Sequence, residues 1–153
     1  MKKLLAFLLL LCAGTLSAYE NLLGVSAYSL SKLTRFEVES MRIGEYEIII
    51  PYEVENAFLS FSGVRVGGIV GCNNFSAPYE IQGGGRVLIV GSGALTRKMC
   101  ASSLESQIEA IFARNFSGRF IVQGDDEMIE LVGDNGFRIR LVPAVSMEPD
   151  FIR

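Results

Sequence analysis

Short runs of alternating hydrophobic and polar residues dominate the chain from about residue 33 onward. A period of two places successive side chains on opposite faces of a β-strand. Runs of this kind lie around residues 33–38, 43–50, 58–61, 64–70, 79–81 and 87–90. Glycine-rich turns follow the last two runs, and we expect the adjacent Gly67 and Gly68 to mark a bulge or a sharp bend. The pattern predicts a series of short strands.

One segment has the period of a helix instead. Hydrophobic residues recur at helical spacing at Leu104, Ile108, Ile111 and Phe112. Ser102 can cap the start, and Glu105 stands three residues later, which is the capping-box arrangement. Gly118 is a natural stop, so we expect a helix over about 102–116.

After this helix the period returns to two. Hydrophobic residues alternate with polar ones at Phe120 and Val122, at Ile129 and Leu131, and at Phe137, Ile139 and Leu141. The turn signals between them are Gly124-Asp125-Asp126 and Asp134-Asn135-Gly136. This pattern predicts a three-stranded antiparallel meander with one solvated face.

The order of the elements predicts the fold class. Many strands precede one helix and three strands follow it, without the regular strand–helix alternation of a parallel sheet. We therefore expect an α+β fold that is mainly antiparallel β. Its core would be a strongly curved sheet, or an incomplete β-barrel, with the single helix packed against it.

The first residues have the layout of an export signal. Lys2 and Lys3 precede an apolar run over residues 4–11, and small residues lead to Ala18. This order predicts a signal peptide over residues 1–18, cleaved after Ala18. The apolar run is shorter than the roughly 20 residues that cross a membrane, so we expect no transmembrane span. The predicted location is periplasmic or secreted.

Cys12 leaves a lipid-anchored form open as the less favoured interpretation. Lipid-modified cysteines of exported proteins normally follow a small residue, whereas Leu11 precedes this one. The apolar run before Cys12 is also short.

Composition excludes several classes of function. The 153 residues include no histidine, which removes a Ser-His-Asp triad, a Cys-His dyad and an imidazole metal ligand. The formal charge is −3, from 14 Lys and Arg against 17 Asp and Glu, and loss of Lys2 and Lys3 with residues 1–18 makes it −5. No basic surplus neutralises phosphates, so we expect no nucleic-acid partner. No constellation of activated groups is visible, and we expect neither enzymatic activity nor a cofactor.

Two cysteines, Cys72 and Cys100, remain after residues 1–18 are removed. An even count in an exported chain suggests a structural disulfide, and the chain-entropy model gives a loop of this length roughly 3–4 kcal/mol. Two separate buried thiols are the alternative. A redox dithiol would lack the usual C-x-x-C spacing, and a metal site would need two further ligands.

Two sequence blocks carry a resemblance to a known family. Residues Gly71-Cys72-Asn73-Asn74-Phe75-Ser76-Ala77-Pro78-Tyr79 resemble the G-C-N-x-F-x-x-x-Y signature of the META domain, or HslJ-like, family. Residues Thr96-Arg97-Lys98-Met99-Cys100 resemble the T-x-M-x-C region that precedes the helix of that family. The motif residues are thus Gly71, Cys72, Asn73, Asn74, Phe75, Tyr79, Thr96, Arg97, Met99 and Cys100.

The resemblance covers residues 56–143 and divides the mature chain. Residues 19–55 match poorly and form an N-terminal set of strands, and residues 144–153 form a C-terminal tail. The family resemblance implies a small β-rich domain with one helix, often exported or lipid-anchored, and links to heat shock, antibiotic tolerance or envelope upkeep. It implies no enzymatic activity. Because the two cysteines stand where the family often has them, the resemblance also supports their pairing.

The motif residues have structural interpretations as well as functional ones. Asn73 and Asn74 could bind a ligand through their amides, but we expect them to cap a turn by bonding the local backbone. Phe75 and Tyr79 could line a pocket, but buried aromatic residues are more often core.

Charged and glycine-rich segments also have structural and functional interpretations. Arg97 and Lys98 could hold an anion near the helix N-terminus, although a solvated surface pair is the favoured interpretation. The acidic run at 125–127 lacks a calcium-binding loop, and the glycine runs at 83–85 and 91–93 match no phosphate loop, so all three are interpreted as turns. The carboxylates Glu45, Glu47 and Glu53 cannot be judged as a catalytic pair without distances.

The sequence thus predicts an exported, non-enzymatic META-like domain of the cell envelope. It would support envelope integrity or stress tolerance by binding an envelope protein or a lipid-like ligand. The alternatives are a pilotin-like secretion accessory, a protease-inhibitor-like docking protein, and, as the least favoured, a carboxylate-dependent hydrolase.

Overall fold

A computed structural model describes residue 30 and residues 35–51, 54 and 57–144. The predicted signal peptide over 1–18, Cys12, Glu53 and all of the 144–153 tail except Ala144 lie outside the described residues. Among the helices within these ranges, none has the length and hydrophobicity needed to cross a membrane.

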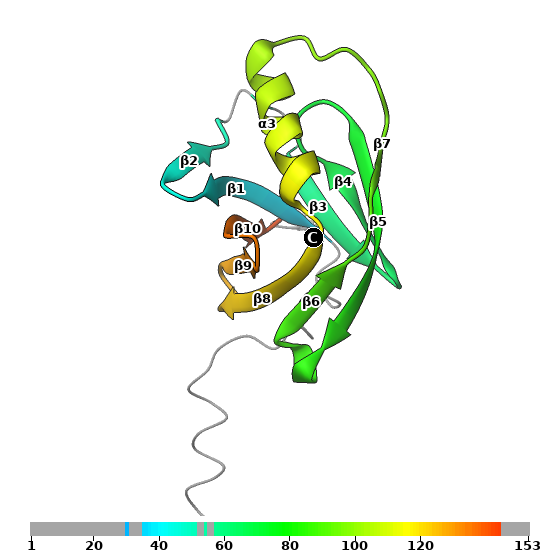
Figure 1. Ribbon diagram of the computed structural model, residues 1–153, viewed down its shortest axis with the longest axis vertical. Helices are drawn as coiled ribbons and strands as arrows, with labels where there is room; N and C mark the ends of the chain where they lie inside the picture. The colour runs from blue at the N-terminus through cyan, green and yellow to red at the C-terminus, as the bar shows by residue number, and fades with distance from the viewer. Residues whose placement is uncertain (1–29, 31–34, 52–53, 55–56, 145–153) are drawn as a thin grey trace, which may run out of the picture.

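The described chain folds as one antiparallel β-barrel with a single long helix (Figure 1). The barrel strands, in their order around the wall, are β1 (Phe36–Ile43), β3 (Phe58–Ser62), β4 (Arg65–Ile69), β5 (Asn74–Gln82), β6 (Val87–Val90), β8 (Gly118–Gly124), β9 (Ile129–Gly133) and β10 (Phe137–Pro143). Two short strands, β2 (Tyr46–Ile49) and β7 (Ala94–Leu95), extend the sheet beyond this wall by pairing with β1 and β5. A 3-10 turn, η2 (Gly83–Gly85), joins β5 to β6.

Strand β1 closes the barrel. It runs antiparallel to β10 from the pair Phe36–Pro143 to the pair Ile43–Phe137, and its opposite edge pairs with β3 at Phe36 and Glu37. The mainly antiparallel, curved sheet is therefore confirmed, and it forms a closed barrel. Residues 36–43, which belong to the poorly matching segment 19–55, therefore supply a wall strand of the barrel.

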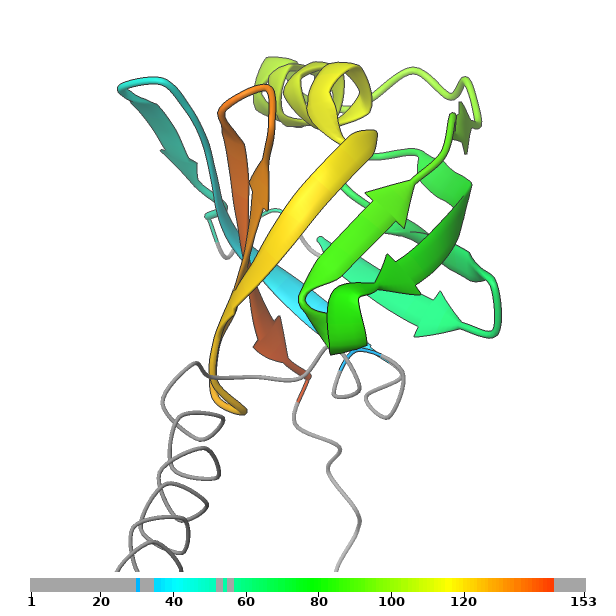
Figure 2. The same ribbon diagram turned by 60° about the horizontal axis from the view of Figure 1, so that its bottom comes forward.

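Helix α3 (Ser103–Asn115) confirms the predicted helix. The Ser102 hydroxyl accepts a hydrogen bond from the Glu105 backbone N–H, and the Glu105 carboxylate accepts one from the Ser102 backbone N–H, as a capping box requires. The helix lies across one end of the barrel (Figure 2). Its buried face, with Ile108 and Phe112, therefore covers the core at that end.

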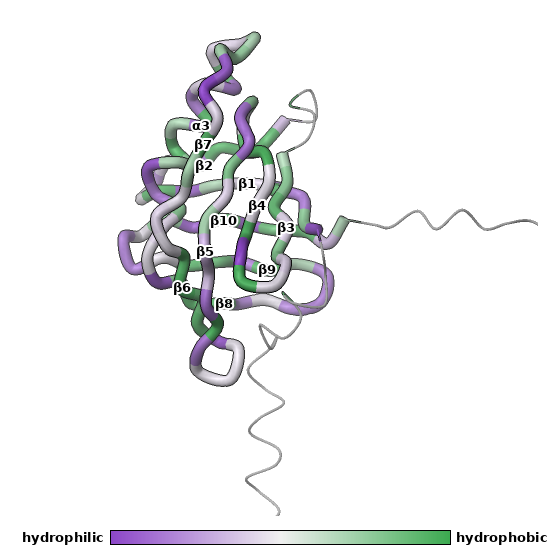
Figure 3. The backbone as a smooth tube through the Cα atoms, turned by 90° about the vertical axis from the view of Figure 1, so that its right-hand side faces the viewer, coloured by the Kyte–Doolittle hydropathy of each residue, from purple (hydrophilic) through white to green (hydrophobic). Residues whose placement is uncertain are grey.

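Aromatic side chains join the helix to the barrel. Phe112 and Phe116 stack with ring centroids 4.7 Å apart, and the Phe75 ring of β5 meets Phe112 edge-on at 5.0 Å. Phe116 also contacts Phe120 of β8, with the ring centroids 5.4 Å apart. Hydrophobic and hydrophilic stretches alternate along the chain (Figure 3), and the inward positions pack as one buried cluster. The barrel interior is thus a packed core.

The predicted meander is present as β8, β9 and β10, with Asp134-Asn135-Gly136 as its second turn. The prediction of a bulge at Gly67-Gly68 is wrong, because β4 keeps regular register with both β3 and β5 through these residues. Close backbone approach is the reason for Gly68: a Cβ atom there would collide with the backbone carbonyl of Phe58.

Two neighbouring glycines give a matched test of this packing. Gly68→Ala would force β3 and β4 apart, and we expect it to lower the free energy of unfolding by about 1–3 kcal/mol. Gly67→Ala is the control, because its Cβ would lie 3.4 Å from the nearest atom, the Phe75 carbonyl oxygen. Urea unfolding of both variants checks this, and equal stabilities would contradict the backbone-approach explanation.

Candidate functional site

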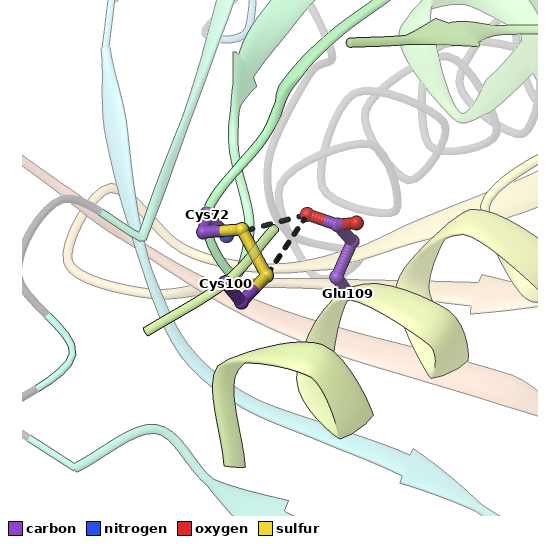
Figure 4. Close-up of side chains that lie close together, drawn as sticks. All are labelled: Cys72, Cys100 and Glu109. Carbon is purple, nitrogen blue, oxygen red and sulfur yellow. Dashed lines mark hydrogen bonds between the residues drawn. A yellow bond between two sulfur atoms is a disulfide. The ribbon is translucent and has the colours of Figure 1, made fainter. Parts of the chain in front are cut away.

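The two blocks of the family-like motif meet beside helix α3. The segment that leads into β5 carries Cys72 and Asn73, and the segment that leads into α3 carries residues 96–100, which we call the Met99 loop. A disulfide joins Cys72 to Cys100, with Cα atoms 5.5 Å apart, as the sequence predicted (Figure 4).

Asn73 is the centre of this junction, with its side chain buried. Its Oδ1 accepts hydrogen bonds of 2.7 Å from the Lys98 backbone N–H and from the Thr96 hydroxyl. Its Nδ2 donates to the Lys98 carbonyl oxygen and to Glu109 Oε1, each at 3.0 Å. The amide thus pairs with both backbone groups of Lys98, as a neighbouring strand would. These bonds link distant segments, whereas a local turn bond was expected.

Glu109 of α3 fixes the other side of the junction. Its Oε2 accepts hydrogen bonds from the backbone N–H groups of Asn73, at 2.9 Å, and Cys72, at 3.3 Å. The same oxygen lies 4.0 Å from Cys100 Sγ. Because a disulfide sulfur carries no hydrogen, we treat this as a packing contact. The carboxylate therefore ties the segment before β5, and the disulfide, to the helix.

Gly71 permits this close approach. Its φ of +95° lies in the region that favours glycine, and a Cβ atom there would lie 2.6 Å from Glu109 Cβ and 2.8 Å from the Glu105 carbonyl oxygen. The three residues thus have separate roles. Gly71 allows contact with the helix, Cys72 forms the disulfide, and Asn73 supplies the buried amide.

Thr96 and Asn74 complete the attachment of the Met99 loop. The Asn74 backbone N–H donates to the Thr96 hydroxyl, and the Thr96 N–H donates to the Asn74 carbonyl, each at 3.0 Å. The side chain of Asn74 itself is exposed. Strand β7 leads into the loop by pairing with Phe75 and Ser76 of β5.

The loop so held presents polar and apolar side chains to solvent. Arg97 and Lys98 are exposed, and Met99 is 98% exposed, the highest value among the large hydrophobic residues of the described chain. An open depression of about 790 Å³ is lined by residues 93–99, along β7 and the loop, and by Asn73 and Glu109.

The two motif aromatics face the core. Phe75 is buried and packs against the helix, and Tyr79 is half-buried with its ring 5.4 Å from Phe61. Burial raises the pKa of the Tyr79 phenol above its ordinary value of 10.0. Ionisation of this tyrosine therefore opposes folding only at alkaline pH.

A metal site at the disulfide would require reduction. The sulfur atoms of Cys72 and Cys100 and a carboxylate oxygen of Glu109 lie within 4.8 Å of one another. The thiolate is the form of cysteine that binds metal, and neither sulfur is a thiolate while they share a bond. The Glu109 oxygens, moreover, already accept the hydrogen bonds described above. This cluster therefore has a structural role, because it links the segment before β5 to the Met99 loop and to α3.

The remaining candidates are parts of turns or strands. Asp125 Oδ1 accepts hydrogen bonds from the backbone N–H groups of Glu127 and Met128, so the acidic run forms the turn between β8 and β9. Glu47 accepts a bond of 3.4 Å from the Ser40 hydroxyl within the β1–β2 hairpin.

Sequence reasoning missed Glu109 as the partner of Asn73. The available signal was its position, because Glu109 borders the helix face that carries Ile108 and Phe112. A partly buried carboxylate at the border of an apolar stripe needs hydrogen-bond donors, and the two backbone N–H groups before β5 supply them.

The fold and this junction define a small disulfide-linked β-barrel domain capped by one helix. The sequence model of the META domain family matches residues 29–146, so the chain belongs to the META domain family. The match includes residues 29–55, in which β1 and β2 lie. A comparison with curated proteins gave no match.

Two solved structures are similar to the chain. One is an NMR structure of a protein from Burkholderia xenovorans, with a TM-score of 0.63 and 20% identity over 80% of this chain and 90% of that one. The other, also an NMR structure, has a TM-score of 0.62 and 19% identity over 80% of this chain and 98% of that one. At these identities the likeness shows the fold alone.

The two adjacent asparagines give a matched test of the junction. Asn73→Ala leaves the Lys98 backbone groups and Glu109 without their amide partner, and we expect it to lower the free energy of unfolding by about 1–3 kcal/mol. Asn74→Ala should change it by less than about 0.5 kcal/mol, because its side chain is exposed. Chemical denaturation with the disulfide intact measures both, and similar small effects would contradict a central role for Asn73.

Proposed function

We propose that this protein is an exported, non-enzymatic domain that supports the bacterial cell envelope by docking to a partner protein through the Met99 loop. The observation that carries the proposal is the contrast within that loop. Its backbone is fastened by Asn73, Thr96 and the disulfide at Cys100, yet Met99 projects almost wholly into solvent.

A fastened loop is suited to binding for a thermodynamic reason. Binding costs free energy when it has to order a flexible loop. A loop that is already held in place before binding costs less to order. Methionine adds an apolar, polarisable side chain that adapts to the surface it meets. An exposed methionine on a fixed loop is therefore a low-cost anchor for a partner.

The charges beside Met99 indicate the chemistry of the partner. Arg97 and Lys98 are exposed next to it, although the chain as a whole is acidic. A partner surface with an apolar pocket flanked by carboxylates would complement this loop. Docking of this kind also fits the alternatives of a secretion accessory or a protease inhibitor, which differ in the partner.

An apolar small ligand has less support as the recognised molecule. The barrel interior is filled by the buried core cluster. A surface groove of about 520 Å³ near β1 and β3 has charged groups in its walls, including Arg35, Glu37 and Glu39. The Arg35 guanidinium stands 3.7 Å from the Phe58 ring centroid there. The other lining residues are apolar, but these charged groups would lose hydration beside a lipid chain, so the groove suits such a ligand poorly.

Export and lack of catalysis rest on sequence and disulfide together. The signal-like residues 1–18 and the Cys72–Cys100 bridge both suit an oxidising compartment outside the cytoplasm. Without histidine, and with these two cysteines covalently paired, the chain has few groups suited to acid–base or nucleophilic chemistry at neutral pH. These features support a binding role.

Position-specific photocrosslinking in living cells tests the proposal. A photoreactive residue at position 99 should give a discrete crosslinked protein in the envelope fraction, which mass spectrometry then identifies. Val64, 73% exposed in the turn between β3 and β4, is the control position, and we expect no such product there.

Titration of the identified partner then measures the contribution of the side chain. Met99→Ser should weaken binding at least about tenfold, since a buried methionine is worth roughly 1.5–3 kcal/mol. Val64→Ser should leave binding unchanged. Equal crosslinking at both positions, or unchanged affinity of Met99→Ser, would refute docking through this loop.

A further inference from the structure

The sulfur atoms of the described chain differ widely in their access to solvent. Met99 is 98% exposed, whereas Met41 of β1 is 1% exposed and Met128, between β8 and β9, is half-buried. Cys72 and Cys100 share a disulfide, so neither offers the thiolate that oxidants attack most readily. Met99 is therefore the most accessible oxidisable sulfur among the residues that the structure describes.

A polar group added to the Met99 side chain would leave the fold intact. A residue that is 98% exposed makes almost no packing contacts, so a new oxygen atom there displaces nothing from the core. The opposite holds for Met41, which belongs to the buried core cluster, because an oxygen added there would be buried without a hydrogen-bond donor. The chemical change at Met99 is thus confined to the surface of the loop.

The chain is held in place on both sides of Met99. Asn73 bonds both backbone groups of Lys98, and the next residue after Met99, Cys100, is joined to Cys72. These links are made by other residues and do not depend on the thioether. The loop therefore presents position 99 in the same place before and after oxidation, and only the chemistry of the side chain changes.

We propose that Met99 is an oxidation site, and that its conversion to methionine sulfoxide prevents the docking proposed above, on which this inference rests. The oxidant is one that transfers oxygen to a thioether, such as hypochlorous acid. A sulfur–oxygen bond forms and the oxygen–chlorine bond breaks, so the sulfur loses two electrons while chloride and a proton leave. Methionine sulfoxide reductases reverse the change with two thiols, which become a disulfide as the oxygen leaves in water.

The sulfoxide does not suit the partner surface that complements this loop. Oxidation turns the apolar thioether into a polar group that accepts hydrogen bonds. In the proposed complex the Met99 side chain enters an apolar pocket flanked by carboxylates, which accept hydrogen bonds but do not donate them. The sulfoxide oxygen would be buried there without a donor, and this costs free energy. Oxidation of one exposed atom thus removes the apolar anchor of the loop.

Limited oxidation of the purified, processed protein tests the site without a partner. After treatment with hypochlorous acid, peptide mass spectrometry should show Met99 oxidised at least about tenfold faster than Met41, which reacts only when the core opens. Protein oxidised at Met99 should keep the urea midpoint of untreated protein. Similar rates at Met99 and Met41, or a lowered midpoint, would overturn Met99 as a separate surface site.

A partly oxidised sample then tests the effect on docking within one experiment. A photoreactive residue replaces Ala94, an exposed residue of β7 that lines the same depression, so Met99 itself is kept. The protein is irradiated, in excess, with the envelope protein that position 99 captures. The crosslinked fraction should contain at least about tenfold less Met99 sulfoxide than the free fraction, because the sulfoxide loses the burial of an apolar side chain. Met128 sulfoxide is the control and should be equally frequent in both fractions.

The outcomes separate this proposal from the proposed function. Equal amounts of Met99 sulfoxide in the two fractions would overturn control by oxidation and leave docking through the loop in place. Equal depletion of Met128 sulfoxide would overturn Met99 as the responsible residue. If untreated protein gives no crosslinked product from position 94 or position 99, docking is refuted, and its control by oxidation is refuted with it.

Discussion

The buried amide of Asn73 is the constraint on which the candidate site depends. A buried amide costs free energy unless its donors and acceptor are all paired, and here Thr96, Lys98 and Glu109 provide the partners. Those partners belong to two different segments, the Met99 loop and α3. Satisfying one side chain therefore fixes the position of the loop relative to both the barrel and the helix. The disulfide reinforces this arrangement, and Gly71 makes room for it.

The closed barrel explains why surface segments are free for recognition. Because β1 and β10 seal the wall and aromatic residues fill the interior, the fold does not need the exposed side chains of the Met99 loop to bury its core. This loop lies beside α3, at the end of the barrel that the helix covers (Figure 2). The proposed contact with an envelope partner therefore uses a surface that the core does not require.

Sequence reasoning predicted the features that depend on local patterns. The capping box at Ser102 and Glu105, the meander with its Asn135-Gly136 turn, and the antiparallel sheet all follow from periodicity and turn chemistry. Features that depend on long-range contacts were not predictable in this way. Pairing of β1 with β10 joins segments about a hundred residues apart, and nothing in residues 36–43 alone specifies that partner. Gly68 was interpreted as a bend for the same reason, because its neighbour, Phe58, comes from another strand.

Hydrogen exchange at the Lys98 amide tests the central claim most directly. This N–H lies in an exposed loop, outside any strand or helix, and its acceptor is the side-chain oxygen of Asn73 at 2.7 Å. If the buried amide holds the loop, Lys98 should exchange at least about a hundredfold more slowly than Arg97 and Met99 on either side, since protection follows the opening free energy. Exchange of all three amides at the rate of an unstructured peptide would contradict the account.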